Sequence, residues 1–161
     1  MTDQPPGSES AISAPVRRVA VLGTGKMGST LATRLSELGV DVQLWDRTAS
    51  RAEALGIGTV HAHPIEAARA APIVLSSLTG LDAILATYLG PVGALAGGRG
   101  KVFVEMSTAG PGVVDALGSH VEEAGARLVG APILGAPPIV GRGEATILAG
   151  GAAEEDRKSV V

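Results

Sequence analysis

Cysteine is absent from this chain of 161 residues, so the sequence excludes disulfides and thiolate metal sites. A chain without cysteine fits a reducing compartment, and we expect a cytoplasmic protein. Only one Phe, one Tyr and one Trp are present, which excludes the exposed stacking rings of proteins that bind RNA or single-stranded DNA. The net charge of −3 argues against a nucleic-acid surface, which needs clustered Lys and Arg. No apolar run approaches the roughly 18 residues of a membrane span. We therefore expect neither a nucleic-acid nor a membrane partner.

The length of the chain favours one domain with short extensions. Residues 1–15 are rich in Pro, Ser, Glu and Gln and lack the apolar core of a signal peptide, so we expect a disordered N-terminal tail. Residues 16–151 form the expected domain. Residues 152–161 begin with acids and continue with bases, which is typical of a helix start, and we expect this helix to be truncated.

Short apolar runs alternate with helical periodicity along the domain, and Gly or Pro marks nearly every junction. This alternation predicts an α/β fold with a doubly wound, mostly parallel sheet. We expect strands at 17–22, 40–45, 59–61, 73–75, 101–106, 127–129 and 145–148, and helices at 27–38, 50–55, 65–70, 81–88 and 113–124.

A glycine-rich string follows the first expected strand and opens the first expected helix. It consists of Gly23, Thr24, Gly25, Lys26, Met27 and Gly28. The G-x-G-x-x-G pattern is specific in this context, because the first glycine permits a tight turn, the second lets a pyrophosphate approach the backbone, and the third lets helix and strand pack closely. The free N–H groups of the helix start then attract the phosphates. The sequence therefore predicts a Rossmann dinucleotide-binding domain.

Asp46, Arg47 and Thr48 end the second strand, and they point to different cofactors. An acid at this distance from the turn accepts hydrogen bonds from the ribose hydroxyls of NAD. Arg47 instead suits the 2′-phosphate of NADP, with Thr48 as an additional hydroxyl donor, although Asp46 would repel that phosphate unless it turns away. Arg47 as a solvated charge at a helix start is the alternative. We expect NADP as the cofactor, with NAD still open.

Hydroxyl side chains follow two later strands. Thr79 comes shortly after one strand, next to Leu78, and Ser107 and Thr108 come after another. Open α/β sheets bind ligands beyond the carboxyl ends of their strands, so these hydroxyls are candidates for contacts with cofactor or substrate. Capping of the following helices is the competing interpretation.

Five segments of the sequence resemble the β-hydroxyacid dehydrogenase superfamily, which includes 6-phosphogluconate dehydrogenase, 3-hydroxyisobutyrate dehydrogenase and the imine reductases. These segments are Val21–Gly28, Trp45–Thr48, Ile73–Thr79, Glu105–Pro111 and Ala131–Gly151. The resemblance implies that the glycine turn binds pyrophosphate, that Arg47 and Thr48 hold a 2′-phosphate, that Leu78 and Thr79 line the cofactor, and that Ser107 and Gly135 contact the substrate.

The sequence also departs from the family pattern. Glu105 replaces an Asp, Thr79 replaces a Pro, Asp46 replaces an Asn, and Leu134 and Ala136 replace a Ser and a Gly beside Gly135. Loss of the loop Ser removes a hydroxyl that holds a carboxylate in the hydroxyacid enzymes. Together with the Trp-Asp-Arg-Thr string, this favours the imine-reductase branch and hydride transfer from NADPH to a small substrate with a C=N or C=O bond.

Family members continue into a helical domain that supplies the general acid and most of the dimer contacts. The resemblance therefore implies a fragment that is inactive alone, a general acid beyond Val161, and a homodimer for the full-length form. We expect no metal site, because His61 and His63 lack a third ligand nearby. The alternative is a nucleotide-binding or redox-sensing module without catalysis.

Overall fold

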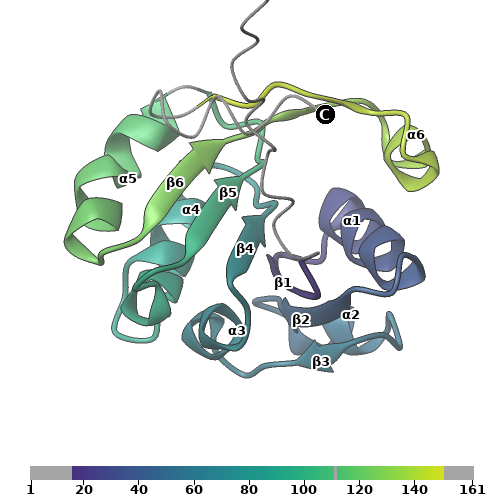
Figure 1. Cartoon of the computed structure of the whole chain (residues 1–161), viewed down its shortest axis with the longest axis horizontal. Coiled ribbons are helices and arrows are strands. Elements are labelled where there is room, and N and C mark those ends of the chain that lie inside the picture. The colour runs from purple at the N-terminus through teal and green to yellow at the C-terminus, as the bar shows by residue number, and fades with distance from the viewer. Residues whose placement is uncertain (1–15, 111, 151–161) are drawn as a thin grey trace, which may run out of the picture.

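A computed structural model describes residues 16–110 and 112–150, which fold around a six-stranded sheet (Figure 1). All of its strands are parallel, and their order is β3-β2-β1-β4-β5-β6. The expected doubly wound sheet is therefore confirmed, and the order reverses between β1 and β4. The strands are β1 (Arg18–Leu22), β2 (Asp41–Trp45), β3 (Thr59–Val60), β4 (Ile73–Ser76), β5 (Val102–Glu105) and β6 (Arg127–Gly130).

Helices cover both faces of this sheet. One face is packed by α1 and α2, and the other by α3, α4 and α5, with a short 3₁₀ turn η1 beside α3 (Figure 1). Each helix is amphipathic enough to bury small apolar side chains, such as Ala32 of α1 and Ala67 of α3, against the strands. The helices are α1 (Lys26–Glu37), α2 (Ala49–Glu53), α3 (Pro64–Ala70), α4 (Leu81–Tyr88), η1 (Ala94–Gly97) and α5 (Gly112–Glu123).

Alternation along β4 and β5 decides which side chains face the helices. Val74 and Ser76 of β4, with Phe103 and Glu105 of β5, are buried, whereas the residues between them are only half-buried. Because successive strand residues point to opposite faces, the last residue of each strand ends on the buried side. Two polar side chains, Ser76 of β4 and Glu105 of β5, are thereby placed in the core.

A second, two-stranded sheet follows the main one. The strand expected at 145–148 exists as β8 (Thr146–Ile147), but it pairs antiparallel with β7 (Ile133–Leu134) and lies outside the parallel sheet. Between them, α6 (Pro137–Arg142) packs on α1, a helix that the sequence analysis did not predict (Figure 1). Its six residues contain two prolines and a glycine, so its periodicity is too short to detect.

A cavity of about 810 Å³ lies on the half-buried face of β4, β5 and β6. It is bordered by α1 and by the segment from Ala131 to Ala149, and its lining is apolar apart from Arg34 and Arg127. None of the glycine-turn residues borders it, so it is not the candidate cofactor site. No helix among the described residues is long and apolar enough to cross a membrane. The expected tail at 1–15 and the helix at 152–161 lie outside the described residues.

Candidate cofactor-binding site

The glycine turn between β1 and α1 has the geometry that its sequence predicts. Gly23 adopts a φ of 91°, and a Cβ there would overlap the carbonyl oxygen of Ser77. A Cβ on Gly28 would overlap the carbonyl oxygen of Gly23, so helix and turn touch backbone to backbone. A Cβ on Gly25 would meet no atom within 4 Å, which leaves the outer side of this residue open to a ligand. The first and third glycines are thus required by packing, and the second is free to face a phosphate.

The start of α1 has the properties of an anion site. Its N-cap is Gly25, which offers no side-chain cap, and its first turn contains no acidic residue. The first N–H groups of a helix have no partner within the helix, and the helix dipole makes this end positive. These residues therefore fit the pyrophosphate of a dinucleotide.

Asp46 is turned towards the glycine turn. Its Oδ2 accepts hydrogen bonds from the backbone N–H of Thr24 at 2.7 Å and from the Thr24 hydroxyl at 3.0 Å, and its Oδ1 accepts one from the N–H of Thr48 at 2.8 Å. The backbone N–H of Gly23 also donates to the carbonyl of Trp45 at 2.8 Å. Asp46 therefore braces the turn against the end of β2, and both of its oxygens already have protein donors.

One cavity of about 340 Å³ lies beside this brace, and we call it the Arg47 cavity. Arg47 and Arg51 border it, together with Trp45 at the end of β2. None of the ion pairs formed among residues 16–110 and 112–150 involves either arginine. Its remaining lining residues are Gly23, Gly25, Asp46, Ser77, Leu78, Thr79, Ala83, Ala86 and Thr87.

A second cavity of about 410 Å³, the Ser107 cavity, lies at the ends of β4 and β5. It shares four bordering residues with the Arg47 cavity, so the two are adjacent parts of one crevice along the carboxyl edge of the sheet. The shared residues are Gly25, Ser77, Leu78 and Thr79. The residues found only here are Lys26, Met27, Gly80, Met106, Ser107, Thr108 and Ile133.

Ser107 is held by two hydrogen bonds and caps no helix in the described contacts. Its N–H donates to Oε1 of Glu105 at 2.8 Å, and its Oγ accepts the backbone N–H of Leu78 at 2.8 Å. The other carboxylate oxygen of Glu105 accepts hydrogen bonds from the hydroxyls of Ser76 and Tyr88. Burial, with the nearby charge of Glu105, raises the pKa of Tyr88 well above its ordinary value. Tyr88 therefore stays protonated at neutral pH and donates.

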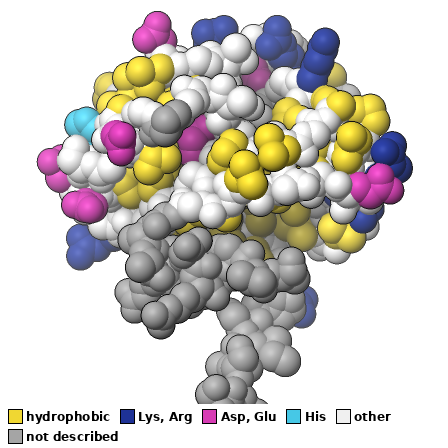
Figure 2. Space-filling model, turned by 90° about the horizontal axis from the view of Figure 1, so that it is seen from above, with side chains coloured by type: hydrophobic (Ala, Val, Ile, Leu, Met, Phe, Trp, Pro, Cys, Tyr) yellow, Lys and Arg dark blue, Asp and Glu magenta, His cyan; other side chains and the backbone are white. Residues whose placement is uncertain are grey.

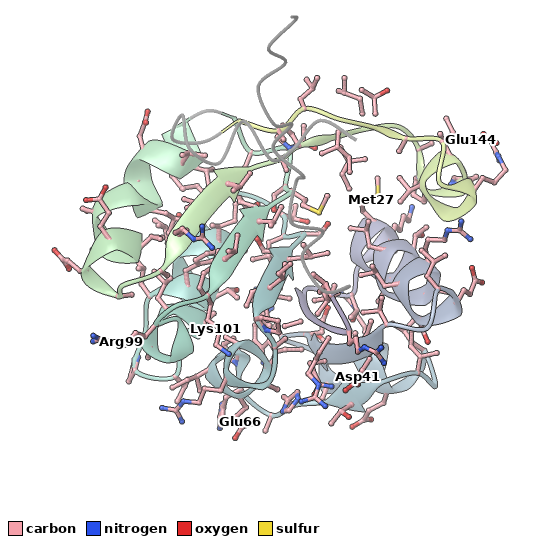
Figure 3. All side chains as sticks on the ribbon, in the orientation of Figure 1. Met27, Asp41, Glu66, Arg99, Lys101 and Glu144 are labelled. Carbon is pink, nitrogen blue, oxygen red and sulfur yellow. The ribbon has the colours of Figure 1, made fainter. Side chains whose placement is uncertain are left out.

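Gly135 and His61, which the sequence analysis named, lie elsewhere, as does Lys101 just before β5. Gly135, in the connection between β7 and α6, does not border the Ser107 cavity, although Ile133 of the same segment does. Lys101 lies at the opposite edge of the sheet from Met27 and donates to the carbonyl of Arg69 at 2.9 Å (Figure 3). His61 bonds to Gln43 at 2.9 Å. The described residues contain no group of three or more ligands for a metal ion.

Sequence reasoning missed two parts of the site. Arg51 lies in α2, whereas Arg47 precedes the N-cap Thr48 of this helix, so helical spacing gave no signal that both side chains border one cavity. The network of Ser76, Tyr88 and Glu105 gave no signal either, because Tyr88 looked like one more apolar residue of a helix. Only the register that pairs Ser76 with Glu105 brings these groups together.

Seen from above, the surface carries its charged side chains mainly around the periphery, and hydrophobic side chains lie both among them and nearer the middle (Figure 2). The crevice is bordered by polar and apolar side chains in similar numbers, and its charged side chains are three cations, Lys26, Arg47 and Arg51, and one carboxylate, Asp46. This composition suits an anionic dinucleotide.

The fold, the glycine turn and the adjacent cavities define a dinucleotide-binding domain. Residues 18–160 match the NAD binding domain of 6-phosphogluconate dehydrogenase, and the chain belongs to this family of NAD(P)-dependent oxidoreductases. It is 33% identical over 141 residues to the cytokine-like nuclear factor N-PAC of Danio rerio, an alignment that covers 84% of this chain and 30% of that protein.

Two solved structures of enzymes are similar to the chain in both sequence and fold. The imine reductase of Streptomyces aurantiacus is 32% identical, with a TM-score of 0.77, over 87% of this chain and 50% of that one. A reductive aminase from Aspergillus terreus, in complex with NADPH and ethyl-5-oxohexanoate, is 26% identical, with a TM-score of 0.73, over 87% and 49% of the two chains. The chain thus spans about half the length of these enzymes.

Proposed function

We propose that this domain binds NADP(H) and serves an oxidoreductase that transfers hydride to or from a small β-hydroxyacid, carbonyl or imine substrate. The observation that carries the cofactor choice is the pair Arg47 and Arg51, which border one cavity without an ion-pair partner among the described residues. Guanidinium groups bind phosphate strongly through charge-assisted hydrogen bonds. The reductive aminase of similar fold that binds NADPH supports the same choice.

The orientation of Asp46 supports the choice of NADP(H). A carboxylate pointing into the cavity would repel a 2′-phosphate, but this one accepts three hydrogen bonds from Thr24 and Thr48. Its oxygens face the turn, where the partial positive charges of N–H groups offset their charge. Arg47 and Arg51 are left to interact with the phosphate, and the hydroxyl of Thr48 makes no capping hydrogen bond that would compete.

For the chemistry, a bound nicotinamide supplies the hydride, while the protein orients the reactants. We propose that the Ser107 cavity holds the nicotinamide end and the substrate, with the hydroxyls of Ser107 and Thr108 as hydrogen-bonding groups. Apart from Lys26, which lies in the glycine turn proposed to bind the pyrophosphate, no described residue that borders this cavity is a His, Asp, Glu, Tyr or Lys. We therefore propose that the general acid comes from the part of such an enzyme that the relatives have and this domain does not span.

Cofactor binding is tested by fluorescence titration, because Trp45 is the only tryptophan and borders the Arg47 cavity. NADPH and NADH are titrated against the wild type and Arg47→Ala. Loss of one charge-assisted hydrogen bond is worth roughly 1.5–3 kcal/mol, so NADPH affinity should fall about 10- to 150-fold while NADH affinity stays unchanged.

Arg99→Ala is the matched control, since Arg99 lies far from the crevice (Figure 3) and should leave both affinities intact. Equal losses for both cofactors in Arg47→Ala would contradict the 2′-phosphate assignment. Absence of saturable binding to either cofactor would contradict the proposed function itself, and reductase turnover by the purified 161-residue chain would contradict the external general acid.

A nucleotide-binding module without catalysis is the second candidate, and it is favoured by the Danio rerio relative, whose name describes a nuclear factor. The two candidates differ in one measurement. A protein that joins this domain to the second half found in the imine reductases should reduce a cyclic imine or a ketone with an amine if the enzyme proposal holds, whereas a binding module should not.

A further inference from the structure

The ends of β4 and β5 carry a buried polar cluster that borders neither cavity of the crevice. Ser76 and Glu105 are register partners on neighbouring strands, and Tyr88 ends α4 directly above them. All three side chains are buried, with exposed fractions of 0%, 3% and 0%. A buried carboxylate is costly unless it is fully hydrogen-bonded, so its presence here calls for a reason.

The donors to Glu105 divide into two groups. Its Oε2 accepts the hydroxyl hydrogen of Ser76, deep in the core. The hydroxyl of Tyr88 lies 3.2 Å from Oε2 and 2.6 Å from the Ser76 oxygen, so its single hydrogen is shared between these two acceptors. Its Oε1 accepts the backbone N–H of Ser107 at 2.8 Å, at the border of the Ser107 cavity. None of the ion pairs among the described residues includes Glu105. The carboxylate therefore connects the core to a single loop of the site.

Ser107 in turn connects this loop to the one after β4. Its Oγ accepts the backbone N–H of Leu78 at 2.8 Å, and Leu78 borders both cavities. A hydroxyl has only one hydrogen, and in Ser107 that hydrogen is not needed for the bond from Leu78. The Ser107 hydroxyl is thus left as a donor towards an acceptor oxygen in the cavity.

We propose that Glu105 is a positioning residue, which fixes the loop of Ser107 from the core so that the Ser107 hydroxyl donates to a carbonyl or carboxamide oxygen of the ligand. Ser76 and Tyr88 hold the carboxylate in place for this task. The inference rests on the proposed function, because it concerns the nicotinamide end of a bound NADP(H).

The test compares two probes of different length. NADPH is long enough to reach both cavities, whereas adenosine 2′,5′-bisphosphate carries only the half proposed for the Arg47 cavity. Glu105→Leu introduces an apolar side chain of similar size and removes the acceptor for the N–H of Ser107. We expect NADPH affinity to fall about five- to tenfold, the equivalent of one hydrogen bond, with no change for the bisphosphate.

Conservative and double variants separate positioning from general damage. Glu105→Gln keeps an oxygen for the N–H of Ser107, and its amide donates to Ser76, so it should bind NADPH within about twofold of the wild type. In a Ser107→Ala background, Glu105→Leu should cause no additional loss, because the hydroxyl that it positions is gone. Glu105→Asp, which is one methylene too short to reach both groups of donors, takes the place of Glu105→Leu if that variant does not fold.

Equal losses for both probes, or a full additional loss in the Ser107→Ala background, would overturn the positioning role. So would unchanged NADPH affinity in a folded Glu105→Leu or Glu105→Asp variant. A wild-type protein that binds neither probe would instead refute the proposed function, so the two failures are distinguishable.

Discussion

The two cavities of the crevice are each braced by one carboxylate, and the surroundings of these carboxylates differ. Asp46 is only partly buried, and its donors belong to the buried Thr24 and to the exposed Thr48. Glu105 is 3% exposed, and two of its donors lie in the core. Water can reach Asp46 itself and the N–H of Thr48, but it reaches Glu105, Ser76 and Tyr88 poorly. The carboxylate of Asp46 therefore connects two loops at a site that water can reach, whereas the carboxylate of Glu105 is part of the core.

The largest effect should come from the close contact between the glycine turn and α1. Gly28→Ala places a Cβ on the carbonyl oxygen of Gly23, and backbone cannot move aside as a side chain can. We expect a loss of at least about 3 kcal/mol in the free energy of unfolding. Urea denaturation followed by circular dichroism measures it.

Gly25→Ala is the matched control, because a Cβ there meets no atom within 4 Å. It should change stability by less than about 0.5 kcal/mol and yet weaken NADPH binding. If the two alanine variants lost equal stability, the close contact between turn and helix would not be the reason for Gly28.

The second prediction compares the carboxylates directly. Glu105→Ala leaves a small cavity and an unsatisfied N–H on Ser107, and should destabilise the protein by about 3 kcal/mol. Asp46→Ala exposes the N–H of Thr48 and opens room for water beside Thr24, because position 46 is only partly buried, and should cost about 1 kcal/mol. Both values come from the same urea titrations. A larger loss for Asp46→Ala than for Glu105→Ala would reverse the contrast between the two sides.

The third prediction concerns pH. Burial and the charge of Glu105 raise the pKa of Tyr88 in the folded state above the ordinary value of 10.0. The folded state thus holds this proton more tightly than the unfolded state, so stability is complete below pH 10 and falls as the pH rises through the folded pKa. The slope is at most about 1.4 kcal/mol per pH unit.

Tyr88 is the only tyrosine, so tyrosinate absorbance reports its ionisation without interference. Unfolding midpoints of the wild type and Tyr88→Phe at pH values from 8 to about 11 give the linkage, and the variant should lack the part of the slope that Tyr88 supplies. Identical slopes, or a tyrosinate transition at the ordinary pKa in the folded protein, would show that the cluster is open to solvent.

Much of the fold was predictable, because local patterns specify it. Apolar runs such as 18–22 are typical of buried strands, and Gly23 and Gly28 indicate the turn through steric requirements that no other residue meets. The prediction failed where periodicity was short or ambiguous. The helix α6 has only six residues, which is too short for a detectable period. The strand β8 has two residues, so neither the partner strand of β8 nor its direction followed from the sequence.

The site was predictable to a different extent on each side. Gly25, Lys26, Met27, Leu78, Thr79, Ser107 and Thr108 all border the crevice. Asp46 also borders it, but the sequence could not show that its oxygens turn to Thr24 and Thr48, because a side-chain direction depends on which donors the folded loops present.

By itself, the sequence determined the parallel sheet, the glycine turn at its centre and the membership of a dinucleotide-binding family. Each of these follows from spacing, steric limits or motif order within short stretches of chain. Only the tertiary structure decided that Asp46 is partly exposed whereas Glu105 is part of the core, and that Arg51 borders the same cavity as Arg47. Those features depend on contacts between strands and loops that are distant in sequence, such as Ser76 with Glu105, and the register of the sheet alone brings them together.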